Sequence, residues 1–387
     1  MPAGDESGPW PRAVRLLALA CVFVAALALF TNAAQPRQMD FISFWAAGKL
    51  SLAGNPLAAY DIAAHKQVQL ALGQFDDLMP FAYPPPFLLL VTPLAVLPYG
   101  VSVIVWVVGT FALYVAAARR VWPSAGWAAA AFPPVLVNGI TGQNGLLTGA
   151  IFISGMSLLE RRPVRAGLLL GCLIIKPQLA VLLPVAFAVG GHWPAFFGAA
   201  ASSAGLLLVA LLLYGAHSYV AFAELMPLFA SIATDGLVGW HKMASVYASM
   251  RLAGSPAAIA WGGQILIGCA ATAAVWAVWR SPAELSAKAA VLAAASVLIS
   301  PYVYLYDTVL LLLPFLWLVR NGEDPRLLAV LWCVPLVVAL QNLGFNQLLN
   351  PAPLLPIALL VLMCRRLRQG GSAQDGVSRH ASDPVTR

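Results

Sequence analysis

The sequence predicts an all-α protein that crosses a membrane many times, and three observations support this fold class. Hydrophobic residues make up 61% of the chain and charged residues 10%, whereas about a quarter of the residues in a soluble domain are charged. Apolar runs separated by short polar segments recur from Val14 to Cys364. The runs lack the apolar/polar alternation of membrane β-barrels, so we expect helices, which satisfy their own backbone hydrogen bonds in lipid.

Twelve segments are predicted to be transmembrane helices, with ends defined to within several residues. They are 13–30, 86–118, 125–138, 143–159, 166–176, 178–190, 194–213, 257–279, 289–300, 306–319, 327–342 and 353–364. Residues 86–118 are too long for one straight helix and contain Pro93 and Pro98, so they form either one bent element or two spans. Several other segments are too short to cross alone, which is tolerated where they are buried in protein or line a wet cavity.

The basic residues favour an inner (plasma) membrane protein with both termini in the cytoplasm. In this orientation 16 of the 22 Lys and Arg residues fall on the cytoplasmic side, as the positive-inside rule requires. Splitting 86–118 would move Arg119 and Arg120 to the outer side, so we keep one bent element. The predicted organisation is a cytoplasmic N-terminus 1–12, a transmembrane domain 13–364 with outer-face loops at about 31–85 and 214–256, and a disordered cytoplasmic tail 365–387.

Charge and cysteine placement argue against several other classes. The net charge of +7 follows the predicted topology, so we expect no nucleic-acid partner. The five cysteines are widely spaced within apolar segments, which argues against disulfides and metal sites, and no motif indicates a cofactor. Residues 12–34 imitate a cleaved signal peptide, but the later spans favour an uncleaved anchor helix.

Asp40 is the first candidate for chemistry, because it lies in an apolar stretch of the first outer loop. A carboxylate in apolar surroundings has a raised pKa and can act as a general base or pair with a cation. The alternative is that Asp40 caps a surface helix starting at Phe41. Asp61 is interpreted as a helix cap or turn residue.

Four further residues are candidate substrate contacts, each with a structural alternative. Tyr83 contacts substrate or is an interfacial tyrosine at a proline-rich helix start. Gln143 and Asn144 either hydrogen-bond a polar ligand or form a tight turn between helices. Lys176, inside an apolar run, either binds a lipid phosphate or extends to the outer headgroups.

Two clusters complete the predicted site. His241, Lys242 and Arg251 either bind phosphate or belong to a solvated loop face. Tyr304 and Asp307 lie in a run containing three tyrosines, which indicates a sugar-binding wall or an aromatic belt.

The order of these motifs resembles glycosyltransferase family 87, polyprenol-phosphate-mannose-dependent enzymes with the GT-C membrane fold. The resemblance rests on Asp40 with Trp45-Ala46-Ala47-Gly48, Gly54-Asn55-Pro56 with Tyr60, Tyr83-Pro84-Pro85 with Pro93-Leu94, Gly142-Gln143-Asn144, Ala166-Gly167-Leu168-Leu169-Leu170-Gly171 with Lys176-Pro177, and Ser300-Pro301. It implies inverting transfer of a sugar, typically mannose, from a polyprenyl-phosphate carrier to an acceptor hydroxyl on the outer face. Asp40 would be the catalytic base, membrane lipids would surround the protein, and the acceptor would be a glycolipid or glycan.

One difference from the family affects the donor contacts. Many relatives follow Ser-Pro with a Trp and a His pair, whereas this chain has Tyr304, Tyr306 and Asp307. The contacts of those histidines therefore do not carry over, and the donor sugar can differ. The resemblance implies cations near the donor phosphate, and Lys176, Lys242 and Arg251 are the available ones.

Two other functions remain open at this point. A multi-span transporter or lipid flippase would bind substrate near the bilayer midplane and often shows internal repeats. We see no repeat and no charged pair deep in facing spans. In a non-catalytic assembly subunit, Asp40 would be dispensable. For the enzyme, we expect a pocket between the first outer loop and the span ends near 143, 176 and 307.

Overall fold

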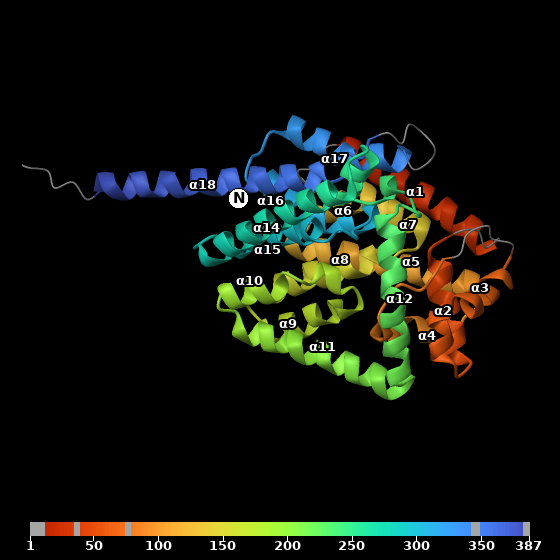
Figure 1. Ribbon diagram of the computed structural model, residues 1–387. Coiled ribbons are helices and arrows are strands. Elements are labelled where there is room, and N and C mark those ends of the chain that lie inside the picture. Colours follow the sequence, from red (N-terminus) through yellow and green to blue (C-terminus); the bar gives the residue numbers. More distant parts are fainter. Residues whose placement is uncertain (1–11, 35–38, 74–78, 342–348, 382–387) are drawn as a thin grey trace, which may run out of the picture.

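The computed structural model describes residues 12–34, 39–73, 79–341 and 349–381, which form helices and no β-strand (Figure 1). The α-helices are α1 (Arg12–Ala34), α2 (Phe41–Leu52), α3 (Ile62–Leu70), α4 (Leu88–Leu94), α5 (Tyr99–Val121), α6 (Ala125–Ala131), α7 (Pro133–Thr141), α8 (Gly145–Leu158), α9 (Pro163–Gly171), α10 (Leu183–Val189), α11 (Trp193–Tyr214), α12 (Ala216–Thr234), α13 (Val246–Leu252), α14 (Ala257–Arg280), α15 (Leu285–Ile299), α16 (Leu312–Arg320), α17 (Pro325–Gln341) and α18 (Leu354–Ala381). The 3₁₀ helices are η1 (Pro56–Tyr60), η2 (Pro85–Phe87), η3 (Cys172–Ile175), η4 (Pro177–Leu179), η5 (Trp240–Lys242) and η6 (Leu305–Leu311).

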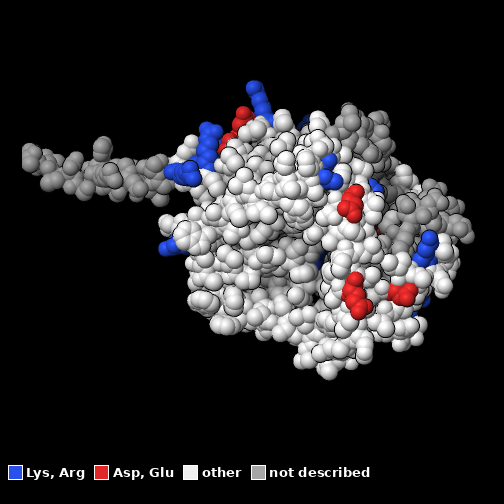
Figure 2. Space-filling model, viewed as in Figure 1, with Lys and Arg blue, Asp and Glu red and all other residues white. Residues whose placement is uncertain are grey.

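The surface of the molecule is that of a membrane protein. Within the described residues, five helices are long and apolar enough to cross a bilayer: α1, α5, α11, α12 and α14. Large apolar side chains project outward from them, as at Phe30, Leu212 and Leu266. Figure 2 shows charged side chains toward the two ends of one face, with a wide uncharged surface between them. Such a surface suits hydrocarbon, so the predicted all-α membrane class is confirmed at this level.

Prolines divide several predicted spans into shorter helices. The prediction of one bent element at 86–118 is wrong, because α4 ends at Leu94 and α5 begins at Tyr99 after Pro98. Proline lacks a backbone N–H and restricts the residue before it, so a helix seldom continues through it. The predicted span 125–138 is likewise split into α6 and α7, just before Pro133.

The predicted second outer loop, 214–256, is largely helical. It contains α12, η5 and α13. Figure 1 shows α12 running across the direction of α8, α14 and α15 rather than alongside them. The ring of Phe222 in α12 packs on Tyr60 of η1, with the ring centroids 5.9 Å apart. This helix therefore joins the two predicted outer loops into one structure, although its polar residues and Pro227 concealed it in the sequence.

Helix α18 continues past Cys364 to Ala381, into the segment 365–387 that is predicted to be a disordered cytoplasmic tail, of which residues 382–387 lie outside the described range. Arg366 donates hydrogen bonds to the Glu323 carboxylate at 2.7 Å and to the Gly322 carbonyl at 2.7 Å. Arginine also has a high helix propensity. These contacts and propensities account for the helix continuing past Cys364.

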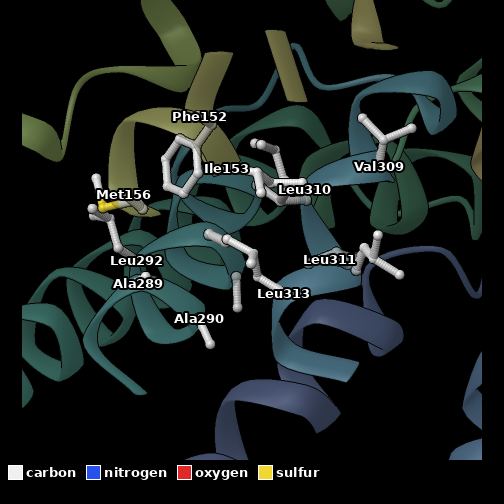
Figure 3. Packing of buried hydrophobic residues seen from close by; sticks show 14 of the residues in the cluster. Phe152, Ile153, Met156, Ala289, Ala290, Leu292, Val309, Leu310, Leu311 and Leu313 are labelled. Carbon is white, nitrogen blue, oxygen red and sulfur yellow. The ribbon is translucent and has the colours of Figure 1, made fainter. Parts of the chain in front are cut away.

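The main core surrounds α15, which is buried without interruption from Ala289 to Leu298. A helix that is apolar on all sides belongs inside a protein or bilayer, and its many alanines allow neighbouring helices to approach closely. Figure 3 shows Phe152 of α8 near Leu310 of η6 in this core. The packing fixes α8 and η6 against each other, and both lead into the polar cluster described below.

A second core, rich in aromatic residues, holds the segment predicted to be the first outer loop. Phe44 of α2 contacts the rings of Tyr83, Phe87 and Trp106, with centroid separations of 5.2, 4.9 and 5.8 Å. Edge-to-face aromatic pairs of this kind contribute about 0.5–1.5 kcal/mol beyond area burial. These contacts hold α2 against η2 and α5.

Candidate functional site

Asp40 occupies the N-cap position of α2, but its side chain makes no capping hydrogen bond. Its Oδ2 atom instead accepts a hydrogen bond from Nε2 of Gln143 at 2.9 Å. The Gln143 Oε1 atom accepts one from the Tyr83 hydroxyl at 2.9 Å. The interpretation of the Asp40 side chain as a helix cap is therefore wrong, whereas Asp61 does cap α3, by accepting from the Ala64 backbone N–H at 2.8 Å.

The sequence before Gln143 explains how this amide reaches Asp40. Helix α7 ends at Thr141 and is capped by Gly142, whose φ of 68° lies in the left-handed region that favours glycine. A side chain at Gly142 would also collide with Phe41, because its Cβ would lie 2.7 Å from the Phe41 Cβ. The indole of Trp106 donates to the Gly142 carbonyl at 2.9 Å. The turn therefore lies directly against the start of α2.

Lys176 lies at the break between η3 and η4 and is paired with a carboxylate. Its Nζ is 2.5 Å from Oδ1 of Asp307 and 3.1 Å from Oδ1 of Asn144. The side chains of Lys176 and Asp307 are 3% and 0% exposed. The alternative of a lysine extending to the headgroups is therefore wrong, and Lys176 and Asp307 form a charged pair inside the protein that the sequence did not reveal.

The tyrosines beside Asp307 form one wall of this cluster. The Tyr304 and Tyr306 rings are stacked, with centroids 5.4 Å apart, and the Tyr306 ring centroid lies 4.6 Å from the Lys176 Nζ. The Asp307 carboxylate also accepts from the Tyr304 backbone N–H at 3.3 Å. Tyr306 was not among the predicted site residues, although its place in the tyrosine run next to Asp307 was a usable signal.

Asn138 and Gly145 place the Tyr306 backbone, and neither was predicted. The Asn138 amide donates to the Tyr306 carbonyl at 2.8 Å. A Cβ on Gly145 would lie 2.3 Å from that same carbonyl oxygen, so only glycine permits the approach. An isolated amide in the otherwise apolar run 133–141 was the signal that could have identified Asn138.

The segment carrying His241 and Lys242 is attached to the same wall. Met243 forms an antiparallel β-bridge with Tyr304, and the Ala244 N–H donates to the Val303 carbonyl at 2.7 Å. The Asn350 amide donates to the carbonyls of Trp240 and Met243, at 2.9 and 2.6 Å. Residues 240–244 are thus fixed at the edge of the tyrosine wall.

Three predicted site residues, His241, Lys242 and Arg251, make no direct side-chain contact with the cluster among the described residues, and Lys242 is exposed. The Arg251 guanidinium lies 4.7 Å from the Trp240 ring centroid and donates to the Ser255 carbonyl at 3.1 Å. His241 is half-buried, and its pKa is lowered by burial and by the adjacent Lys242 charge. The structure therefore joins seven of the predicted residues directly through hydrogen bonds, an ion pair or ring stacking: Asp40, Tyr83, Gln143, Asn144, Lys176, Tyr304 and Asp307.

The electrostatics of the cluster suit Asp40 to proton transfer. Burial raises the pKa of its carboxyl above the ordinary value, while the Gln143 hydrogen bond and the charges of Lys242 and Lys176 oppose that rise. A carboxylate with a raised pKa is a stronger base than a solvated one. Nearby, the buried Nδ2 group of Asn144 has no hydrogen-bond partner among the described residues and is an available donor. The arrangement can accept a proton and bind a polar ligand side by side.

Comparison with known proteins gives a match for the central part of the chain. The family described as glycosyltransferase family 87 matches residues 81–301, more than half of the 387 residues. No curated protein and no solved structure matches. The matched region contains Tyr83, Gln143, Asn144 and Lys176, whereas Asp40 and the Tyr304–Asp307 segment lie outside it.

Proposed function

Because the chain belongs to glycosyltransferase family 87 and is therefore a membrane glycosyltransferase, we propose that it transfers a sugar from a polyprenyl-phosphate carrier, with Asp40 as the general base. The observation that carries this proposal is the Asp40 carboxylate, which is half-buried, has a pKa raised by burial, and is held by Gln143 in the same polar cluster as Lys176 and Asp307. A base that is partly withdrawn from water beside a polar cluster is the arrangement that hydroxyl activation requires. We propose mannose as the sugar and the outer face as the site of transfer.

The proposed chemistry is a direct displacement. The acceptor hydroxyl oxygen attacks the anomeric carbon opposite the phosphate, so the anomeric configuration inverts. Asp40 takes the hydroxyl proton as the new carbon–oxygen bond forms and the bond from carbon to phosphate oxygen breaks. The polyprenyl phosphate leaves as a stable anion, so no second carboxylate is needed to protonate it.

Other residues of the cluster have supporting roles in this proposal. Gln143 orients the carboxylate, and Tyr83 orients Gln143 in turn. The free amide group of Asn144 is available to a donor oxygen. The Tyr304 ring offers the kind of face on which a sugar ring packs. The acceptor would be a glycolipid or glycan, reached from the outer side of an inner (plasma) membrane with both termini cytoplasmic.

Asp40→Asn tests the proposal, with Asp61→Asn as the matched control. Both changes remove one carboxylate from the first loop, but asparagine still caps α3. In membranes supplied with radiolabelled polyprenyl-phosphate-mannose, Asp40→Asn is expected to lower transfer by about 10²–10⁴-fold, the typical contribution of a general base. Asp61→Asn is expected to retain the wild-type rate.

Separate results would contradict the role of Asp40, the identity of the donor sugar and the inversion of configuration. Equal rates for wild type and Asp40→Asn at equal protein levels would remove Asp40 from catalysis. Transfer from a different lipid-linked sugar, with mannose ignored, would correct the donor. A product that keeps the anomeric configuration of the donor would exclude the single displacement.

A further inference from the structure

Of the four basic residues that the sequence suggests for phosphate binding, two are engaged in contacts and a third has a pKa that disfavours its charged form. Lys176 is buried and paired with Asp307, so a phosphate approaching it would have to compete with a carboxylate already in contact. Arg251 is stacked on Trp240 and bonded to a backbone carbonyl. Burial and the adjacent Lys242 charge lower the pKa of His241, which disfavours its cationic form.

Lys242 differs from the other three. Its side chain is exposed, and it forms no ion pair within the part of the chain that the structure describes. It nevertheless lies beside the cluster, because the next residue, Met243, forms a β-bridge with Tyr304, and its charge is one of those that oppose the rise in the Asp40 pKa. A cation that is unpaired and near the base can bind an anion without displacing another protein group.

The backbone beneath Lys242 is held from three sides. The Asn350 side-chain amide donates hydrogen bonds to the carbonyls of Trp240 and Met243, which lie on either side of Lys242 in the chain. The Met243 bridge to Tyr304 ties the segment to the tyrosine wall. The Trp240 indole donates to the Ala233 carbonyl at 3.0 Å, which attaches the segment to the end of α12. Only the flexible lysine stem is left to adjust to a ligand, which lowers the entropy lost on binding.

We propose that Lys242 binds the phosphate group of the lipid-linked donor and of the polyprenyl-phosphate product, whereas Lys176 serves to hold Asp307 and the tyrosine wall in place. The inference rests on the proposed function for the identity of the ligand. It divides two lysines that look equivalent in the sequence into an anion-binding residue and a positioning residue.

Binding of polyprenyl phosphate, compared with the uncharged polyprenol of equal chain length, tests this division without requiring sugar transfer. The proteins are purified full-length wild type, Lys242→Gln, Lys242→Arg and the exposed control Lys66→Gln, each checked for an unchanged thermal unfolding midpoint. Wild type and Lys66→Gln are expected to prefer the phosphate. Lys242→Gln is expected to lose about tenfold or more in phosphate affinity with no change for the alcohol, and Lys242→Arg to keep most of it.

The outcomes separate this inference from the proposed function. If Lys242→Gln keeps the wild-type preference for phosphate, or if wild type shows no preference, Lys242 is not the anion site. If Lys242→Gln loses the preference but wild-type protein transfers no sugar from any polyprenyl-phosphate donor, the anion site stands and the proposed transfer fails. Because the Lys242 side chain is exposed, the preference should also weaken as salt is raised.

Discussion

The two ion pairs formed by the described residues lie at opposite ends of one helical segment, residues 305–320, and their surroundings differ sharply. At the start of this segment, Asp307 pairs with Lys176, and both side chains are almost fully buried. Just beyond its end, Glu323 pairs with Arg366, and the side chains are 13% and 33% exposed, respectively. The buried pair is further held by Asn144 and by the Tyr304 backbone, whereas the other pair is partly exposed to solvent.

The difference shows how the environment changes what a charged residue does. A surface pair gains little, because water and salt screen it and both side chains lose freedom. A buried pair loses hydration energy that its mutual attraction must offset, so removal of one partner leaves an uncompensated charge. Charges kept inside a membrane protein despite this cost usually serve a function. The buried end is where we place the chemistry, and the exposed end is structural.

The largest expected effect comes from breaking the buried pair. Lys176→Met should leave Asp307 buried without its cation and destabilise the protein by about 3–5 kcal/mol. The double variant Lys176→Met/Asp307→Leu should recover most of that stability, because no charge remains buried, but not the transfer activity. Thermal unfolding of the purified proteins measures both effects. A single variant as stable as wild type would show that the pair is not desolvated as the structure describes.

An intermediate effect is expected on the pH dependence of transfer. Asp40 must be ionised to act as a base, and its pKa is raised, so the rate should fall on acidification at a higher pH than for an ordinary aspartate. Gln143→Met removes a hydrogen bond to the ionised form of Asp40, which raises the pKa of the carboxyl further and moves the acidic fall in rate to higher pH. Gln67→Met, at an exposed glutamine of α3, should leave the pH dependence of the rate as in wild type. If Gln143→Met also leaves the acidic fall in rate at the wild-type pH, a group other than Asp40 causes that fall.

The smallest effect is expected at the exposed pair. Arg366→Gln should change the free energy of unfolding by less than about 1 kcal/mol and leave transfer unchanged, since it removes a solvent-facing partner. The same unfolding measurement, repeated at low and high salt, should show a difference that shrinks as salt rises. A loss as large as that of Lys176→Met would contradict the contrast between the two ends.

Part of the site could be predicted from local sequence alone. Asp40, Gln143 and Lys176 each stood out as polar residues in apolar surroundings, where such residues are unfavourable without a purpose. Helix breaks were predicted less well, because a proline such as Pro98 signals either a kink or an end and the sequence does not distinguish them. Helix α12 was missed because its polar residues and Pro227 lowered the apolar signal.

The amino-acid sequence by itself determined that this protein belongs in a membrane and where along the chain its polar residues occur, since hydropathy and backbone hydrogen bonding are local properties. Only the tertiary structure decided the partners. Gln143 holds Asp40 across 103 residues, and Lys176 meets Asp307 across 131. Side chains so far apart in the chain meet only when helix ends converge, and that convergence depends on how the apolar helices pack around α15. The same packing leaves Lys242 exposed and Lys176 buried. The two residues are both lysines, so this difference in hydration could not be predicted from residue type.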